Sequence, residues 1–410
     1  MNQNFETQLK KYAALIVATG INVKPGDTVV IQIAVDQAPL ARLLTSESYR
    51  LGAAEVIVDW QDTTITRHLI SQSDLTRLSA GPDYLKAKID YWIAHKAKRI
   101  SVMSADPQAF AKVDSNRLNT YQKALGQINQ RLRSITQNND VSWTVVAAAS
   151  PEWAQLVFPD LATTEAVRAL WTEIFKTARV DQPDPVAAWQ AHDTKLHRKA
   201  AWLNQMQFDA LHYQAPGTDL TIGLPKNHIW EGASSANAQG EAFMANMPTE
   251  EVFTAPDHRR IDGTVHATKP LSYAGQMLTD LSFTFRNGQV TAATAKTGQE
   301  ILDQLLQTDA GAKSLGEVAL VPDPSPISQS GITFYNTLFD ENASNHLALG
   351  AAYPFSIQNG TKMNPLELQA AGLNQSLIHV DFMVGSAHMN IDGITKTGKT
   401  MPIFKNGDWA

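Results

Sequence analysis

The chain has 410 residues, so two or three domains are expected. Hydrophobic residues make up 43% and charged residues 18%, which is typical of a globular protein that can bury large cores. The formal net charge is −6, from 34 basic and 40 acidic residues, and no basic cluster stands out. A nucleic-acid-binding surface is therefore not expected.

The sequence has no cysteine, which excludes disulfides, thiolate metal sites and a cysteine nucleophile. The N-terminus has no basic start, and its apolar run, 13–18, is too short for a secretory signal. No stretch approaches the roughly 18 apolar residues of a membrane span. We therefore expect a soluble, cytoplasmic protein without membrane contact.

Helical and strand-like patterns alternate through the first part of the chain. Hydrophobic periodicity predicts helices over 5–18, 38–51, 84–95 and 116–135, and strands over 28–33, 55–60, 99–103 and 142–149. Strands separated by helices favour right-handed βαβ units and a parallel sheet. No glycine-rich phosphate-binding loop follows any of these strands, so nucleotide binding is not expected.

Two prolines within 181–185 separate two further predicted helices, 162–179 and 186–207. This is the best domain boundary, and it gives an α/β domain over 1–182 and a second domain over 183–410. After residue 208, short strand-like runs alternate with Gly, Pro and Asn turns, which favours an α+β domain with a mixed or antiparallel sheet.

The pair His379 and Asp381 lies in an apolar run that is typical of a β-strand. Residues two apart in a strand project from the same face, so an imidazole and a carboxylate would lie side by side. These two ligand types suit a divalent metal ion. Taken alone, the same pair also fits a surface pair or a hydrogen-bonded core pair.

Three other segments combine acids or histidines with a restricted backbone. Glu250 and Glu251 lie between two prolines, and in an extended chain only one of them should reach a given ion. Glu317 opens an apolar strand. An acid- and asparagine-rich stretch ends at His346, and Tyr353 follows it. Each segment alone also fits an ordinary helix-terminal acid, strand-edge charge or solvated turn.

Five motifs occur in a fixed order: Asn-Met-Pro-Thr-Glu-Glu-Val-Phe-Thr-Ala-Pro, Gly-Glu-Val-Ala-Leu-Val, Phe-Asp-Glu-Asn-Ala-Ser-Asn-His, Ala-Tyr-Pro and Ile-His-Val-Asp-Phe-Met-Val-Gly. Together they resemble the thermophilic metalloaminopeptidase family, over nearly the whole chain and in its length and two-domain layout. The resemblance implies that the α+β domain is the catalytic one.

The family resemblance implies a two-metal exopeptidase site that acts through an activated water. The implied metal ligands are Glu251, Glu317, Glu341, His346, His379 and Asp381. Glu317 would be shared by both ions, and Glu250 is the candidate general base, although the roles of Glu250 and Glu251 could be reversed. Tyr353 matches the family's site tyrosine and is the candidate donor to the oxyanion.

Elementary chemistry agrees with this ligand set. Two divalent ions need several carboxylates, one of them bridging, and they lower the pKa of a bound water. Oxygen and nitrogen ligands admit zinc, cobalt or manganese. The sequence has no His-Glu-x-x-His motif, so the resemblance does not imply a helix-borne single-zinc mechanism.

The expected function is that of an aminopeptidase acting on peptides with a free N-terminus, and the resemblance also implies a homodimer. Two alternatives remain. The first is metal-dependent hydrolysis of another bond, such as a phosphoester, although the candidate segments contain no Lys or Arg to hold phosphate. The second is a catalytically inactive binding protein of the same fold.

Overall fold

The computed structural model describes residues 3–410 and divides them into two compact units. The first unit comprises the chain through Asp193 together with Ala233–Thr249, and the second comprises Thr194–Gly232 and Glu250–Ala410. The boundary after residue 182 remains a prediction for independently folding domains.

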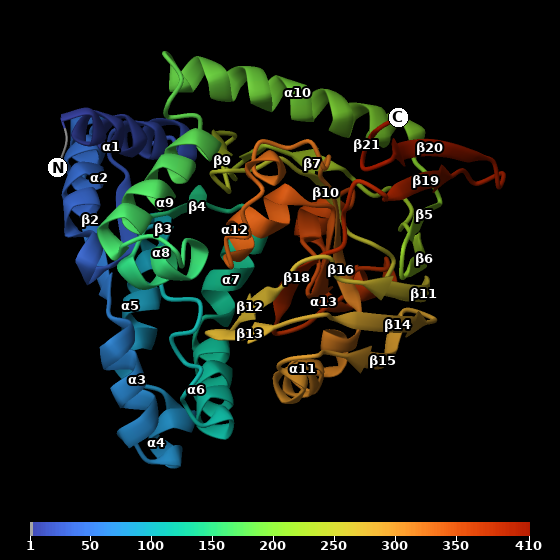
Figure 1. Cartoon of the computed structure of the whole chain (residues 1–410), viewed down its shortest axis with the longest axis horizontal. Helices are drawn as coiled ribbons and strands as arrows, with labels where there is room; N and C mark the ends of the chain where they lie inside the picture. Colours follow the sequence, from blue (N-terminus) through green and yellow to red (C-terminus); the bar gives the residue numbers. More distant parts are fainter. Residues whose placement is uncertain (1–2) are drawn as a thin grey trace. The chain divides into compact units, whose positions relative to one another are not determined.

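Within the described chain, the first unit is built on a four-stranded parallel sheet in the order β2-β1-β3-β4 (Figure 1). Its strands are β1 (Thr28–Ala34), β2 (Glu55–Gln61), β3 (Lys98–Met103) and β4 (Trp143–Ala147). Its helices are α1 (Gln3–Leu15), α2 (Ala38–Arg50), α3 (Thr63–Gln72), α4 (Leu75–Ala80), α5 (Asp83–Ala94), α6 (Ser115–Ile128), α7 (Gln130–Gln137), α8 (Pro151–Val157) and α9 (Thr163–Thr177). The predicted α/β class is confirmed.

Apolar packing joins these helices to the sheet. Val30 of β1 lies in one buried cluster with Ile89 and Trp92 of α5 and Leu132 of α7. Each of these side chains is less than a tenth exposed, so their burial is a main source of the unit's stability.

Two local predictions differ from the structure. The helix predicted over 116–135 is divided at Asn129, whose ψ of −2° departs from regular helix geometry. Helices α3 and α4 were not predicted, because each is short and buries a single residue, Ile70 in α3 and Leu78 in α4. Both begin at an aspartate, Asp62 and Asp74, whose carboxylate accepts backbone N–H bonds of the first turn.

Helix α10 (Pro185–Met206) leads into the second unit. The described part of that unit contains a five-stranded antiparallel sheet in the order β18-β17-β16-β10-β7. Its strands are β7 (Glu231–Gly232), β10 (Val252–Thr254), β16 (Leu315–Leu320), β17 (His346–Gly350) and β18 (His379–Met383). We call this sheet the central sheet.

A second, eight-stranded sheet in the same unit has the order β15-β14-β11-β6-β5-β19-β20-β21 within the described residues. Its strands are β5 (Ala210–Ala215), β6 (Thr218–Gly223), β11 (Ile261–His266), β14 (Ser282–Arg286), β15 (Gln289–Thr294), β19 (Asn390–Ile394), β20 (Thr400–Lys405) and β21 (Asp408–Trp409). The helices of this unit include α11 (Gln299–Leu306), α12 (Thr337–Asp340) and α13 (Pro365–Ala370). The predicted α+β class is confirmed.

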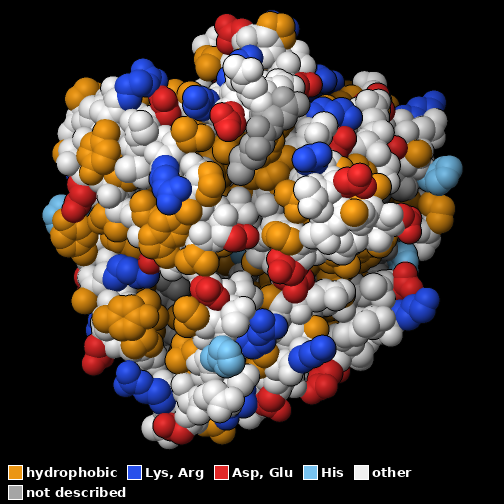
Figure 2. Space-filling model, turned by 60° about the vertical axis from the view of Figure 1, so that its left-hand side comes forward, with side chains coloured by type: hydrophobic (Ala, Val, Ile, Leu, Met, Phe, Trp, Pro, Cys, Tyr) orange, Lys and Arg blue, Asp and Glu red, His pale blue; other side chains and the backbone are white. Residues whose placement is uncertain are grey.

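The surface carries charges of both signs. Figure 2 shows Lys and Arg side chains interspersed with Asp and Glu side chains over one face of the molecule. Among residues 3–410, no helix has both the length and the apolar character to cross a lipid bilayer.

Gly316 marks an irregularity in the central sheet. The pairing of β16 with β17 shifts register between Leu315 and Glu317, so Gly316 is the extra residue of a β-bulge. A Cβ at this position would lie 2.3 Å from the carbonyl oxygen of Ala351 and 2.4 Å from that of Gly350. Glycine is therefore required here, next to Glu317.

We predict that Gly316→Ala lowers the free energy of unfolding by about 1–3 kcal/mol, because the new methyl group must push two strands apart. Denaturant unfolding measures this change. The matched control is Gly126→Ala in the interior of α6, where a Cβ would meet only Arg133 at 3.9 Å. This control should be stabilised by about 0.5–1 kcal/mol. Equal stability of the two variants would contradict the role assigned to Gly316.

Candidate metal centre

One face of the central sheet gathers acidic and histidine side chains from three strands. Glu317 of β16 pairs with Ala348 of β17, and Ala348 pairs with Asp381 of β18. His346 pairs with Ala319, two residues from Glu317. Directly opposed residues of antiparallel strands project from the same face, so this register places Glu317, His346 and Asp381 together.

His379 lies on the same face, two residues before Asp381 in β18, as the alternation predicted. It pairs with Gly350, which has a φ of +104° and leaves no room for a Cβ, since Ile378 O would lie 2.2 Å away. Gly350 and Ala348 are small, so they leave space between the larger ligand side chains.

Two groups of potential ligand atoms form on this face, each with all its atoms within 4.8 Å of one another. The first comprises Glu251, Glu317 and His346, and the second comprises Glu317, His379 and Asp381. Glu317 belongs to both. Its Oε1 lies 3.7 Å from Nε2 of His346, and its Oε2 lies 3.2 Å from Nε2 of His379. The two carboxylate oxygens therefore face different histidines.

Backbone carbonyls hold both histidines in the orientation that a metal requires. Nδ1 of His379 lies 2.7 Å from the carbonyl oxygen of Ala351. Nδ1 of His346 lies 2.9 Å from the carbonyl oxygen of Glu341 and 3.1 Å from that of Ser344. Nδ1 carries a proton in such a contact, so Nε2 of each ring points toward the carboxylates and is the atom that could bind a metal in the neutral ring.

The carboxylates keep oxygens that protein donors do not satisfy. Within the described chain, Oε2 of Glu251 and Oδ1 of Asp381 are buried without a hydrogen-bond partner. Nε2 of His346 is only 2.9 Å from Oε2 of Glu251, but the contact lacks hydrogen-bond geometry. Unpaired buried carboxylate oxygens are costly. A bound cation would satisfy them, so the residues present fit a metal ion.

The electrostatics of the metal-free cluster favour charged histidines. Burial tends to lower the pKa of His346, but the carboxylates of Glu251 and Glu317 outweigh it and raise that pKa well above its usual value. The pKa of His379 is raised in the same way: burial opposes the shift, and Tyr353 and Asp381 drive it. Burial tends to raise the pKa of Glu317, but the two histidines lower it to about 2.

Glu251 and Glu341 are surrounded by other carboxylates of the cluster. Burial raises the pKa of Glu251, although His346 opposes the shift, and the negative charges of Glu317 and Asp381 add to it. Burial and the charge of Asp381 raise the pKa of Glu341 well above its usual value. The cluster thus carries more carboxylates than its two imidazoles neutralise, which favours a divalent cation.

The other predicted site residues lie close to this cluster or next to it in sequence. Glu341 interacts electrostatically with the ligand groups but belongs to neither of them. Glu251 belongs to one group and Glu250 to neither, as expected if only one of two neighbouring extended residues faces an ion. The ring of Tyr353 lies 5.0 Å from that of His379.

Two buried asparagines near the candidate ligands were not predicted as site residues. The side-chain oxygen of Asn342 accepts the backbone N–H of Glu250 at 2.8 Å, and that of Asn345 accepts the N–H of Val321 at 2.9 Å. Both asparagines are almost fully buried. Both lie in the short stretch between Glu341 and His346, and this local enrichment in asparagine could have indicated a supporting role. Buried amide side chains need specific hydrogen-bond partners.

We predict that metal binding displaces protons and that affinity rises with pH. The raised histidine pKa values favour protonated rings in the absence of metal, whereas a ligand must be neutral. Lowering the pH therefore weakens metal binding, and raising the pH toward the shifted pKa values strengthens it.

Zinc calorimetry in buffers of different ionisation enthalpy should detect up to about two released protons. His379→Ala should release fewer, and the exposed His68→Ala should match the wild type. Binding without proton release would contradict the prediction.

Comparison with known proteins places this geometry in a family. The model of the thermophilic metalloprotease (M29) family matches residues 5–409. The chain is 55% identical to aminopeptidase PepS of Streptococcus thermophilus and 48% identical to aminopeptidase AmpS of Bacillus subtilis, with 99% of both chains covered in each case. It is 38% identical to aminopeptidase T of Thermus thermophilus, again over 99% of each chain.

A solved structure, wild-type AmpT from Thermus thermophilus, superposes with a TM-score of 0.91 at 37% identity, covering 99% of this chain and 100% of that one. The shared fold therefore includes both the parallel sheet and the antiparallel sheets. The sequence resemblance, the family match and the superposition agree, and the chain belongs to the thermophilic metalloprotease family.

Proposed function

We propose that this protein is a metal-dependent aminopeptidase that releases N-terminal amino acids from peptides at a two-metal site. Relatives that match almost its full length are named aminopeptidases. The observation that carries the two-metal proposal is Glu317, which belongs to two ligand groups and turns one oxygen toward each histidine. A carboxylate in this position suits a bridging ligand.

In this proposal, Glu251 and His346 hold one ion, His379 and Asp381 hold the other, and Glu317 is shared. Glu341 would complete the set as a further carboxylate: burial raises its pKa, and the negative charge of Asp381 adds to the shift. The ligand atoms are oxygen and nitrogen, and we propose zinc, cobalt or manganese as the metal. When bound, the ions would supply Lewis acidity and an activated water.

Tyr353 is the proposed hydrogen-bond donor to the oxyanion. Burial raises the pKa of its phenol, which keeps the proton that a donor needs. The ring is fixed by Phe355, stacked at 5.2 Å, and by Phe253, at 5.9 Å. A donor held in place by packing loses little freedom during the reaction, which is the basis of electrostatic preorganisation.

Glu250 is the proposed general base. It directly precedes Glu251 in the chain, and its backbone N–H donates a hydrogen bond to the side-chain oxygen of Asn342. To act as a base, Glu250 would have to bring its carboxylate within hydrogen-bond reach of the activated water. The cluster's surplus of carboxylates also suits recognition of the positively charged N-terminus of a peptide.

The family resemblance further implies a homodimer and a cytoplasmic location, and we keep both as proposals. Light scattering of the purified protein tests the first: a mass of only the 44.9 kDa monomer at working concentration would rule out the dimer.

The proposed activity predicts a strict requirement for metal and for a free N-terminus. An aminoacyl chromogenic substrate should be cleaved, excess chelator should abolish turnover, and added divalent metal should restore it. A free peptide should shorten by one residue at a time, while its N-acetylated twin stays intact. Chromogenic assay and mass spectrometry measure these outcomes. Turnover that persists in chelator would overturn the metal role, and internal fragments would overturn the exopeptidase assignment.

Variants of Tyr353 and His379 should separate catalysis from metal binding. Tyr353→Phe should keep its metal content and lower kcat by roughly 10²–10³, the usual loss for one oxyanion donor, with little change in KM. His379→Ala should lose metal as well as activity, because a ligand is removed. Metal analysis with steady-state kinetics distinguishes the two. Nearly full kcat in Tyr353→Phe would reduce Tyr353 to a packing role.

A further inference from the structure

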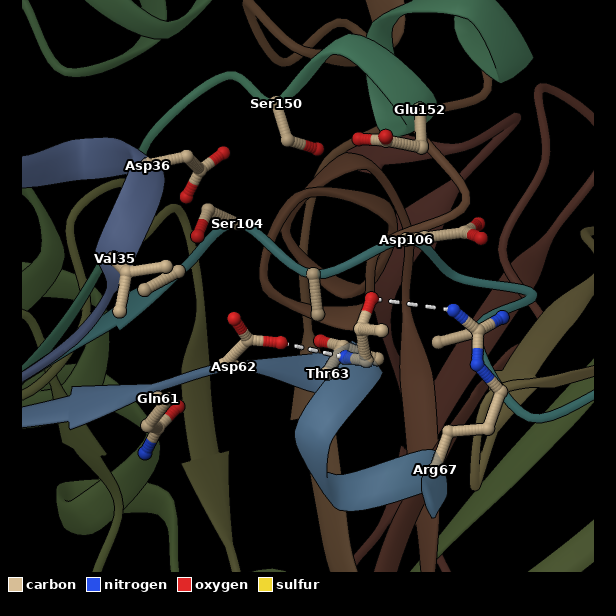
Figure 3. Close-up of a pocket in the computed structure, with 14 residues that line it drawn as sticks. Val35, Asp36, Gln61, Asp62, Thr63, Arg67, Ser104, Asp106, Ser150 and Glu152 are labelled. Atoms are coloured by element: carbon tan, nitrogen blue, oxygen red, sulfur yellow. Dashed lines mark hydrogen bonds between the residues drawn. The ribbon is translucent and has the colours of Figure 1, made fainter.

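The first unit contains a cavity of about 240 Å³ at the carboxyl end of its parallel sheet (Figure 3). The residues that follow β1, β2, β3 and β4 all contribute to its wall. Its polar and charged lining side chains include Asp36, Asp62, Arg67, Ser104, Asp106 and Glu152. All of them belong to the first unit, whereas every residue of the metal centre belongs to the second.

The strand order makes this a favoured position for a ligand. From β1 the chain passes to β2 on one side of the sheet and then to β3 on the other, so the direction of connection reverses between β1 and β3. Open α/β sheets bind ligands in the crevice that this reversal leaves at the carboxyl ends of the strands. Asp36 follows β1 and Ser104 follows β3, directly at the reversal.

Ser104 is a second, independent indication of a ligand. Its side chain is 4% exposed, and its Oγ has no hydrogen-bond partner among residues 3–410. A buried hydroxyl without a partner is destabilising, so such groups call for an explanation. Figure 3 shows Ser104 on the same side of the cavity as Asp36 and Asp62. A change of the Ser104 side-chain rotamer would turn this hydroxyl toward a ligand in the cavity and give it a partner.

The charge of the wall indicates a positive ligand. Four carboxylates line it, against the single guanidinium of Arg67. Oδ1 of Asp62 accepts the backbone N–H groups of Thr64 and Ile65, which leaves its other oxygen for the cavity. Burial raises the pKa of Asp36, and the charges of Glu152 and Asp62 raise it further, so these acids repel one another across the cavity.

The spread of these groups favours an organic ligand over a metal ion. Among residues 3–410, sets of three His, Cys, Asp or Glu ligand atoms within 4.8 Å occur only at the metal centre. The acids of the cavity are distributed along its wall instead of converging on one point. An organic molecule with separated polar groups can reach several of them at once.

We propose that this cavity binds a small organic molecule that carries a primary ammonium group. The ammonium donates hydrogen bonds to the Asp36 carboxylate and to Oγ of Ser104, and the free oxygen of Asp62 adds charge. The ligand is either a diamine or a free amino acid, which share this chemistry. They differ at Arg67, which can pair with the carboxylate of an amino acid but has no partner on a diamine.

Binding of 1,4-diaminobutane and of L-lysine to the full-length protein tests the proposal by calorimetry. We expect at least one of them to bind, and neutral 1,4-butanediol not to bind. Asp36→Asn should weaken binding by about 10-fold or more, the usual effect of losing a charge-assisted hydrogen bond. The matched control, Asp160→Asn on the exposed surface of the same unit, should bind as the wild type does.

Ser104→Ala gives a second readout. Without ligand it should unfold at the same or a higher temperature than the wild type, because an unpaired buried hydroxyl is removed. Its affinity should nevertheless fall by about 3- to 10-fold. A merely structural serine would give the opposite pattern, with lower stability and unchanged affinity.

Arg67→Gln distinguishes the two classes of ligand, a free amino acid and a diamine. Weaker binding of L-lysine with unchanged binding of 1,4-diaminobutane would indicate an amino acid site, and binding of the diamine alone would indicate a diamine site. Binding that persists in His379→Ala and weakens in Asp36→Asn would place the compound in this cavity, and binding lost in His379→Ala but kept in Asp36→Asn would place it at the metal centre and overturn the proposal. No binding of either compound at millimolar concentrations would overturn the proposal, as would equal affinity in the wild type, Asp36→Asn and Ser104→Ala.

Discussion

The antiparallel register of β16, β17 and β18 is the constraint on which the metal centre depends. Glu317, Ala348 and Asp381 form one row across three strands, and a shift of one residue in any pairing would turn a ligand to the opposite face. The bulge at Gly316 sets this register beside Glu317. The ligand geometry is therefore a property of the sheet and not of any single motif.

Much of the fold could be predicted because its signals are local. The strands of the parallel sheet are apolar runs bounded by turns, and β18 shows the alternation that places His379 beside Asp381. Helices α3 and α4 were missed because they are short and mostly exposed, with a single buried residue each. The return of Ala233–Thr249 to the first unit could not be predicted either, since it depends on long-range pairing such as that of Val145 with Asn246.

The proposed ligand residues were named from the sequence through resemblance, but their arrangement in space could not be predicted. The pairing of β16 with β17 joins residues far apart in the chain, and no local pattern specifies it. The carbonyl groups of Ala351 and Glu341, which orient the histidines, have no sequence signal, because every residue has a carbonyl. Support of this kind becomes visible only when the backbone is folded.

The distribution of the ligands over β16, β17, β18 and the residue preceding β10 also bears on folding. Only the native sheet brings these segments together, so an ion that bridges them acts as a cross-link between distant parts of the chain. Because the unfolded chain lacks this arrangement, the free energy of binding adds to the stability of the native state. With the proposed ligands, the free energy of unfolding would therefore rise with the concentration of free metal in the surroundings.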